Sequence, residues 1–210
     1  MAGRSDTREA LLQAGIDLFL MGGYDFTGTN AILERADAPR GSFYHHFEDK
    51  KDFALAAAQH YYEHHLPVLD RHLTDDALDP VERLRQYFRA LAQRFGEGGW
   101  TGGCLLGMLG QELADRDDES RRTLFALFGR WRHRIADCLR EAQLRGEIER
   151  DADCDEIAGF LLDAWEGALI SMKTSRSSAP LERFVRVAFD RILGPLRPST
   201  EGRTERARRR

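Results

Sequence analysis

The chain has 210 residues, of which 42% are hydrophobic and 31% are charged, and its formal net charge at pH 7 is −4. This length and apolar content predict one or two small domains, each with a hydrophobic core. The negative net charge argues against indiscriminate binding of nucleic acid, so any anion-binding surface must come from the placement of the basic residues.

Cysteine content and the distribution of apolar residues indicate the compartment. Three cysteines, an odd number in a chain of this length, do not predict a disulfide framework. No apolar run reaches the length of a membrane-spanning helix, and no basic-then-apolar leader opens the chain. We therefore expect a cytoplasmic protein without membrane contact, with an Arg-rich, disordered tail over residues 195–210.

Helical periodicity runs through almost the whole chain, and no stretch alternates convincingly in the manner of a strand. The sequence therefore predicts an all-α protein. Caps, prolines and glycines divide its N-terminal part into four helices. These are expected from Asp6 to about Met21, from Thr27 or Thr29 to Ala36, from Pro39 onward, and from Asp49 to about His65, before Pro67.

The C-terminal part of the chain predicts five further helices. A glycine-rich break over residues 96–103 separates the first two of them. They are expected over Pro80–Phe95, over Cys104–Ala114, from Asp118 or Ser120 to Gly146, from the cap Asp153 to Met172 or beyond, and over Pro180–Leu193. The natural domain boundary lies within the fourth helix, near residue 55.

The segment APRGSFYHHFEDKKDF, residues 38–53, follows a short helix after a tight turn, which suggests a helix-turn-helix. Phe43 and Phe47 lie four residues apart and can face the core, while Gly41 and Ser42 allow a close approach to DNA. The remaining polar side chains suit phosphate oxygens, and Arg40 could contact a guanine edge. An ordinary amphipathic helix with solvated polar residues is the alternative interpretation.

Residues 23–57, GYDFTGTNAILERADAPRGSFYHHFEDKKDFALAA, resemble the DNA-binding region of TetR-family transcriptional repressors. The resemblance implies a helix-turn-helix DNA-binding domain over residues 1–55 and an effector-binding and dimerisation domain over residues 56–194. It implies a homodimer on a palindromic, double-stranded operator. Asp37-Ala38 departs from the Gly-Val of many relatives. The implied phosphate contacts are Thr29, Tyr44, His46 and Lys50, and the implied base contacts are Asn30, Arg40, Ser42 and His45.

The three cysteines differ in their expected surroundings. Cys104 follows two glycines and should lie at a helix start, where unsatisfied backbone amides favour a thiolate. Cys138 lies on an apolar stripe and should be buried. Cys154 lies among acidic residues that oppose a thiolate. A small buried hydrophobe is the alternative role for Cys104.

Two further segments, GGCLLGMLGQELAD and WEGALISMKTSRSSAPLE, resemble a TetR subgroup that includes the N-ethylmaleimide-reductase repressor and acrylate-responsive regulators. In the former, one cysteine and one lysine form a redox switch, and Cys104 and Lys173 match their positions. The resemblance implies release by a reactive electrophile or oxidant, and we expect the Lys173 stem to run through the core. Trp100 and Trp165 are candidate linings of an apolar effector pocket, although core packing explains them equally well.

Three alternatives to the sensor hypothesis stay open. One is a repressor with reversible binding of a small effector and a structural Cys104. Another is a helical interaction protein that has lost DNA binding, which salt-dependent operator binding would exclude. The third is a thiol enzyme that uses Cys104 and Lys173, but no convincing base stands beside the thiol in the pattern, so we expect no enzyme and no catalytic residue.

Two other patterns stand outside the DNA-binding segment. His60 and His64 lie four residues apart, as in helical zinc sites, but the sequence indicates no third ligand, so we expect neither metal nor cofactor. Wide apolar stripes over Ile157–Met172 and Leu181–Ile192 predict that the last two helices form the dimer interface.

Overall fold

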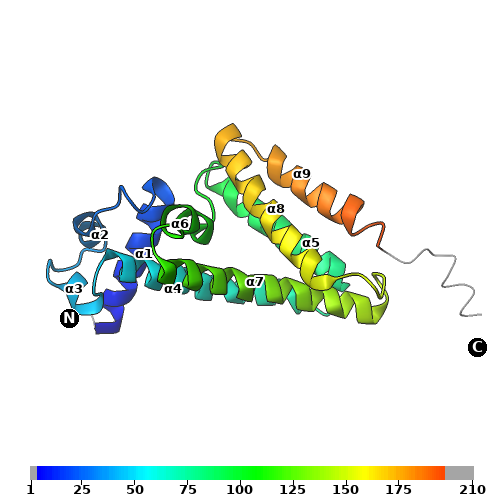
Figure 1. Cartoon of the computed structure of the whole chain (residues 1–210). Helices are drawn as coiled ribbons and strands as arrows, with labels where there is room; N and C mark the ends of the chain where they lie inside the picture. The colour runs from blue at the N-terminus through cyan, green and yellow to red at the C-terminus, as the bar shows by residue number, and fades with distance from the viewer. Residues whose placement is uncertain (1–3, 197–210) are drawn as a thin grey trace, which may run out of the picture. The chain divides into compact units, whose positions relative to one another are not determined.

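The computed structural model describes residues 4–196 of the chain (Figure 1). These residues form nine α-helices and one short π-helical segment, and no strand occurs among them, which confirms the all-α prediction. None of the helices within this range is long and apolar enough to cross a membrane. The predicted disorder of the tail concerns residues that, from 197 onward, lie outside the described range.

The helices mostly begin and end where caps and glycines predict. Asp153 caps α8 by accepting hydrogen bonds from the amides of Asp155 and Glu156, at 3.0 Å each, and Gly146 ends α7 with φ 73°. The elements are α1 (Arg4–Gly22), α2 (Thr29–Arg35), α3 (Ser42–His46), α4 (Lys50–Leu73), α5 (Pro80–Glu97), α6 (Leu105–Leu113), α7 (Asp118–Arg145), α8 (Cys154–Ser175), α9 (Ala179–Val187) and the π-helical η1 (Ala188–Ile192).

Two predicted helix starts are wrong. The first helix begins at Arg4, so Asp6 lies inside its first turn and does not cap it. Pro39 is not in the third helix, because it forms a separate turn in which its carbonyl accepts the amide of Ser42 at 2.9 Å. The third helix, α3, is therefore confined to Ser42–His46.

The predicted end of the fourth helix before Pro67 is also wrong, since α4 continues to Leu73. A proline inside a helix removes one backbone hydrogen bond and strains the preceding turn. Beyond it, Leu69 and Leu73 are buried, with exposed fractions of 0% and 6%. The carbonyl of Leu73 also accepts a hydrogen bond from Arg83 Nη1 at 3.3 Å. Burial and this cap outweigh the cost of the proline.

The chain packs as two compact units. The first comprises the described residues up to Pro67 together with Gly102–Gly129, and the second comprises Val68–Thr101 together with the described residues from Arg130. This division differs from a boundary near residue 55, which falls inside α4. The reason is that α6, although late in the sequence, packs against α1.

Phe53 of α4 lies at the centre of the aromatic core of the first unit. Its ring centroid is 4.8 Å from that of Phe47, 5.1 Å from that of Phe43 and 5.9 Å from that of Phe19. The absence of a side chain at Gly15 of α1 leaves room for this ring, because a Cβ at Gly15 would lie 2.2 Å from Cζ of Phe53. The predicted core anchors Phe43 and Phe47 therefore hold α3 onto α1 and α4.

A second aromatic cluster fills the core of the second unit. The ring centroid of Phe88 on α5 is 5.3 Å from that of Trp165 on α8 and 4.9 Å from that of Phe184 on α9. Helices α8 and α9 lie side by side, as the yellow and orange ribbons of Figure 1 show, and α9 also packs on α5. These contacts explain the apolar stripes of the last two helices only in part, because a face of each remains open.

Candidate DNA-binding surface and sensor region

The first three helices pack on one another around a tight turn. Between α2 and α3, Asp37 takes a left-handed conformation with φ 48°, which aspartate tolerates better than most residues. Phe43 is fully buried and fixes the inner face of α3, so the side chains on either side of it point outward. This is the helix-turn-helix arrangement predicted from the sequence.

The predicted DNA contacts divide by exposure into two groups. Arg40, Tyr44 and His45 on and before α3 are exposed, Tyr44 with 68% of its surface, and so is Asn30 at the start of α2. Thr29, Ser42, His46 and Lys50 are half-buried. The hydroxyl of Ser42 already donates to the carbonyl of Pro39 at 2.7 Å. The structure thus brings all eight residues into one unit, with four of them exposed to solvent.

Lys50 is held in place by its neighbours. Its ammonium lies 4.2 Å from the ring centroid of Tyr24 and 3.5 Å from the carbonyl oxygen of Asp25. Partial burial lowers the pKa of Lys50, against the opposing effect of the Asp25 and Glu112 carboxylates. A cation over an aromatic face keeps its charge while losing freedom. Lys50 therefore presents a positioned positive charge next to α3.

The turn between α1 and α2 is clamped by two residues that sequence reasoning missed. The carboxylate of Glu112 on α6 accepts the amides of Tyr24 and Asp25 at 3.0 Å each. Just beyond α6, Arg116 binds both carboxylate oxygens of Asp25, at 2.7 and 2.6 Å, and this pairing lowers the pKa of Asp25. The partners are almost ninety residues apart in sequence, so no local pattern could have paired them.

Cys104 lies where the sequence predicts, at the N-cap of α6. Gly102 before it has φ 76°, a conformation that a residue with a side chain rarely adopts. The thiol-bearing residue is only 4% exposed, so it is buried from solvent. None of the three cysteines forms a disulfide.

The other two cysteines have environments that oppose a thiolate. Burial raises the pKa of Cys138 to about 12, and its Sγ lies 3.3 Å from the carbonyl oxygen of Pro80. Burial, and then the Asp155 and Asp153 carboxylates, raise the pKa of Cys154. Both observations agree with the roles expected for these residues.

The structure corrects the environment expected for Lys173. This residue is exposed on the last turn of α8, in the second unit, whereas its neighbour Met172 occupies the buried position with 0% exposure. The expectation that the lysine stem runs through the core is therefore wrong. The physical reason is helical spacing, because the apolar stripe through Trp165 and Leu169 reaches Met172 rather than Lys173.

Trp100 and Trp165, the candidate pocket linings, both pack against residues of the second unit. Trp165 is 1% exposed and lies in the aromatic core. Trp100 is half-buried in a left-handed conformation with φ 58°, and its ring lies over Gly96, where a Cβ would be 2.9 Å from Cη2. Core packing accounts for Trp165, and Trp100 closes the glycine-rich break after α5.

An open apolar groove of ≈ 320 Å³ runs between α8 and α9. Phe160 and Val187 border it with 49% and 39% of their surfaces exposed, and one cation, Arg183, stands among its apolar walls. Exposed apolar surface of this kind marks an interaction site. The groove is lined by Phe160, Ala164, Gly167, Ala168, Ser171, Pro180, Arg183, Phe184, Val187, Ala188 and Ile192.

Known regulators resemble this chain over nearly its whole length. It is 35% identical to the transcriptional repressor DhaR of Mycobacterium sp. strain GP1 over 94% of this chain and 96% of that protein. It is 36% identical to the transcriptional regulator AcuR of Cereibacter sphaeroides over 85% of this chain and 81% of that protein. The crystal structure of reduced E. coli NemR superposes with a TM-score of 0.80 at 27% identity, over 87% and 95% of the two chains.

Two family models cover the parts of the chain that carry these features. Residues 11–57 match the model described as bacterial regulatory proteins of the tetR family, which contains the predicted helix-turn-helix. Residues 80–188 match the tetracyclin repressor-like C-terminal domain. The proteins that both models describe, and the named relatives, are transcriptional regulators and not enzymes. This removes the thiol-enzyme alternative. The chain therefore belongs to the TetR family of bacterial transcriptional regulators, proteins that bind operator DNA as dimers and respond to small molecules.

Proposed function

We propose that this protein is a dimeric repressor that leaves a palindromic operator when a reactive electrophile or oxidant modifies Cys104. The observation that carries the proposal is the double role of α6. This helix begins at Cys104 and ends beside Glu112 and Arg116, the two residues that clamp the turn before α2. The likeness to NemR, DhaR and AcuR supports the role of a transcriptional repressor.

The physical link between thiol and DNA lies within the first unit. Cys104 is 4% exposed, so an adduct on its sulfur must displace the start of α6 or its neighbours. A displaced α6 withdraws Glu112 from the amides of Tyr24 and Asp25. Those amides precede α2, which carries the predicted contacts Thr29 and Asn30. Modification thereby changes the geometry of the DNA-binding helices without touching DNA.

The chemistry follows ordinary thiol reactivity. The Cys104 thiolate adds to the electron-poor carbon of a conjugated alkene, forming a carbon–sulfur bond. The electron pair of the carbon–carbon double bond moves to the adjacent carbon, which takes a proton from water. Burial raises the pKa of Cys138 to about 12, and burial followed by the Asp155 and Asp153 carboxylates raises the pKa of Cys154. Cys104 is as buried as Cys138, but it stands at the N-cap of α6, where backbone amides favour a thiolate, so we expect it to react first. Lys173, exposed on α8, is retained as the candidate partner of the thiol by its match to the subgroup pattern alone.

Within the DNA-binding unit we assign base reading to Asn30, Arg40, Ser42 and His45, and phosphate contacts to Thr29, Tyr44, His46 and Lys50. The exposure of Arg40 and His45 and the positioned charge of Lys50 support this division. Half-sites of the operator are expected about one helical turn apart, or ~34–36 Å. Arg40→Ala should relax base preference, whereas Lys50→Ala should weaken all sequences alike and reduce the salt dependence. A selected-sequence experiment in which Arg40→Ala leaves the preference unchanged contradicts the assignment.

We assign dimerisation to the groove between α8 and α9. Its apolar walls and the exposed Phe160 and Val187 need cover, and the same groove on a second copy can supply it by two-fold symmetry. Phe184 is a poor probe of this interface, because it is 7% exposed and packs inside the core of its own unit. Phe160 is the better choice, since its removal leaves the protomer core intact.

The sensor assignment is tested with the purified protein on its own operator, first identified by selection from genomic DNA. Operator binding is followed by fluorescence anisotropy before and after N-ethylmaleimide or hypochlorite, and the modified thiol is mapped by mass spectrometry. The parent should be released, and Cys104→Ser should stay bound. Cys154→Ser is the matched control, because it removes another thiol at a helix start, and it should be released like the parent.

Two results separate the alternatives. If Cys104→Ser leaves the operator as readily as the parent under treatment, the thiol switch is refuted and reversible binding of a small effector becomes the function to test. Lys173→Met examines the lysine separately. It should slow alkylation of Cys104 at neutral pH if the two residues act together, and an unchanged rate contradicts their pairing without affecting the role of the cysteine.

A further inference from the structure

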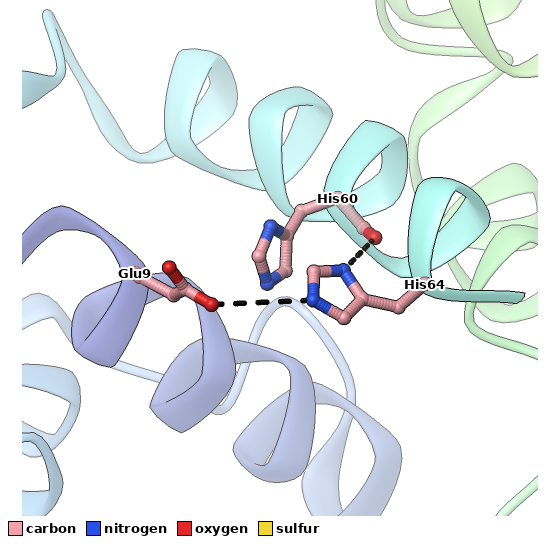
Figure 2. A group of neighbouring side chains, drawn as sticks. All are labelled: Glu9, His60 and His64. Carbon is pink, nitrogen blue, oxygen red and sulfur yellow. Dashed lines mark hydrogen bonds and ion pairs between the residues drawn. The ribbon is translucent and has the colours of Figure 1, made fainter. Parts of the chain in front are cut away.

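Three possible metal ligands from two helices come together in the DNA-binding unit. His60 and His64 lie one turn apart on α4, with ring centroids 4.0 Å apart, and Glu9 of α1 faces them (Figure 2). Oε1 of Glu9 is 4.0 Å from Nε2 of His64, and one donor atom from each of the three residues lies within 4.8 Å of the others. Sequence spacing indicated only the two histidines, and the fold supplies the carboxylate.

His64 is oriented as a metal-binding histidine usually is. Nδ1 of His64 lies 2.9 Å from the carbonyl oxygen of His60, drawn as a dashed line in Figure 2. Because a carbonyl only accepts, Nδ1 donates in this contact, and Nε2 faces Glu9. A backbone carbonyl that fixes the tautomer in this way is the common outer partner of a metal-binding imidazole.

Three charged side chains act on His60. Glu9 and Glu63 carry negative charges that favour a bound cation, and Arg8 carries a positive charge that opposes one.

We propose that Glu9, His60 and His64 bind a divalent transition-metal ion of the Zn²⁺ class, with water in the remaining position. Two neutral imidazoles and one carboxylate are a donor set that zinc accepts. Tetrahedral bonds of ~2.0–2.1 Å place donor atoms about 3.3 Å apart. The Glu9–His64 pair must therefore close by about 0.7 Å from its 4.0 Å separation, and a pair at the 4.8 Å limit of the group must close by about 1.5 Å. Glu9 and His64 have side chains that are 67% and 60% exposed, so small rotations achieve this.

Such an ion would join α1 to α4 by a link that side-chain packing does not provide. Both helices also enclose the aromatic core around Phe53, which holds α3. An ion bound by the folded unit and not by the unfolded chain stabilises the fold through mass action. The proposal concerns a second ligand of the regulator and does not depend on the thiol chemistry at Cys104.

The test is a Co²⁺ titration of the metal-free, full-length protein carrying no histidine tag, followed by visible absorption. We expect one ion per chain and the d–d bands of a four- or five-coordinate site, without the intense charge transfer of a cobalt–thiolate bond. Glu9→Gln, His60→Gln and His64→Gln should each weaken binding at least tenfold. His133→Gln, which removes a histidine on α7 that is 66% exposed, is the control and should bind like the parent.

A second measurement guards against variants that fold poorly. Zn²⁺ at about one hundred times its dissociation constant should raise the Tm of the parent by roughly 5–10 °C. The same addition of Zn²⁺ should leave the Tm of His64→Gln unchanged. Without metal, His64→Gln and the parent should have the same Tm, which would show that the variant folds normally. The proposal is overturned if the parent binds no Co²⁺ at micromolar concentration, if the bands indicate thiolate ligation, or if the three variants bind as tightly as His133→Gln.

Discussion

Replacing Arg83 with methionine should destabilise the second unit by about 3–5 kcal/mol, because Arg83 is a buried cation with many partners. Its side chain is 1% exposed. Nε donates to the carbonyls of Asp75 and Leu78 at 2.6 and 3.0 Å, and Nη1 donates to the carbonyl of Leu73 at 3.3 Å. The guanidinium thereby caps the end of α4 and fixes the loop before α5.

The magnitude depends on the partners that lose their donor. The ion pair with Glu141, at 2.9 Å, is partly buried and matters, whereas Asp76 is 92% exposed and contributes little. Methionine fills a similar volume but donates no hydrogen bond, so three carbonyls and the Glu141 carboxylate lose partners. A loss of about 3–5 kcal/mol corresponds to a Tm lower by roughly 6–20 °C for a chain of this size.

Urea denaturation followed by circular dichroism measures this loss, at one fixed protein concentration because the proposed dimerisation would contribute to stability. Arg83→Lys should fall between the parent and Arg83→Met, since an ammonium retains the charge but not the planar fork. Arg89→Met is the control on the same helix. It removes an arginine side chain that is 52% exposed, and it should change stability by no more than about 0.5 kcal/mol. A loss below about 1 kcal/mol for Arg83→Met would refute the capping role.

Three further predictions concern other parts of the chain. Gly15→Ala should destabilise the DNA-binding unit by about 1–3 kcal/mol, because the new Cβ overlaps the buried Phe53 ring, and weaker operator binding with an earlier thermal transition would show it. Asp117 accepts two hydrogen bonds from Ser120 at the start of α7, and these lower the pKa of Asp117 in the folded protein. The stabilisation from these bonds is therefore fully present above the unfolded pKa of about 3.9, and it is lost as the pH falls through the folded pKa. Asp117→Asn should therefore lower the urea midpoint at pH 6 but much less at pH 3, and an equal shift at both would contradict this. Phe160→Glu should convert the proposed dimer to monomer in light scattering at micromolar concentration, whereas Leu144→Glu, at a residue that is 89% exposed, should not.

Local sequence determined most of the helices and their ends. Asp153 caps α8 and Gly146 ends α7 because side-chain hydrogen bonds and left-handed φ values act within a few residues. The aromatic spacing of Phe43 and Phe47 likewise fixed the inner face of α3. The family resemblance of residues 23–57 then indicated the DNA-binding role, which the match to the TetR models confirms at the level of the family.

Tertiary structure decided what local rules could not. Helix α4 continues through Pro67 because burial of Leu69 and Leu73 outweighs one lost hydrogen bond. Met172 and Lys173 are neighbours in sequence, but the register of α8 places Met172 in the core and Lys173 on the surface. Composition alone does not reveal this difference.

The sites themselves depend on contacts between distant segments. Glu112 reaches the turn before α2 from almost ninety residues away, and Glu9 meets His60 and His64 across two helices. Hydrogen bonds and metal ligation act over a few ångströms in space, whatever the separation along the chain. The sequence alone therefore determined which residues could form helices, caps and ligands, and only the packing of α1, α4 and α6 decided which of them meet.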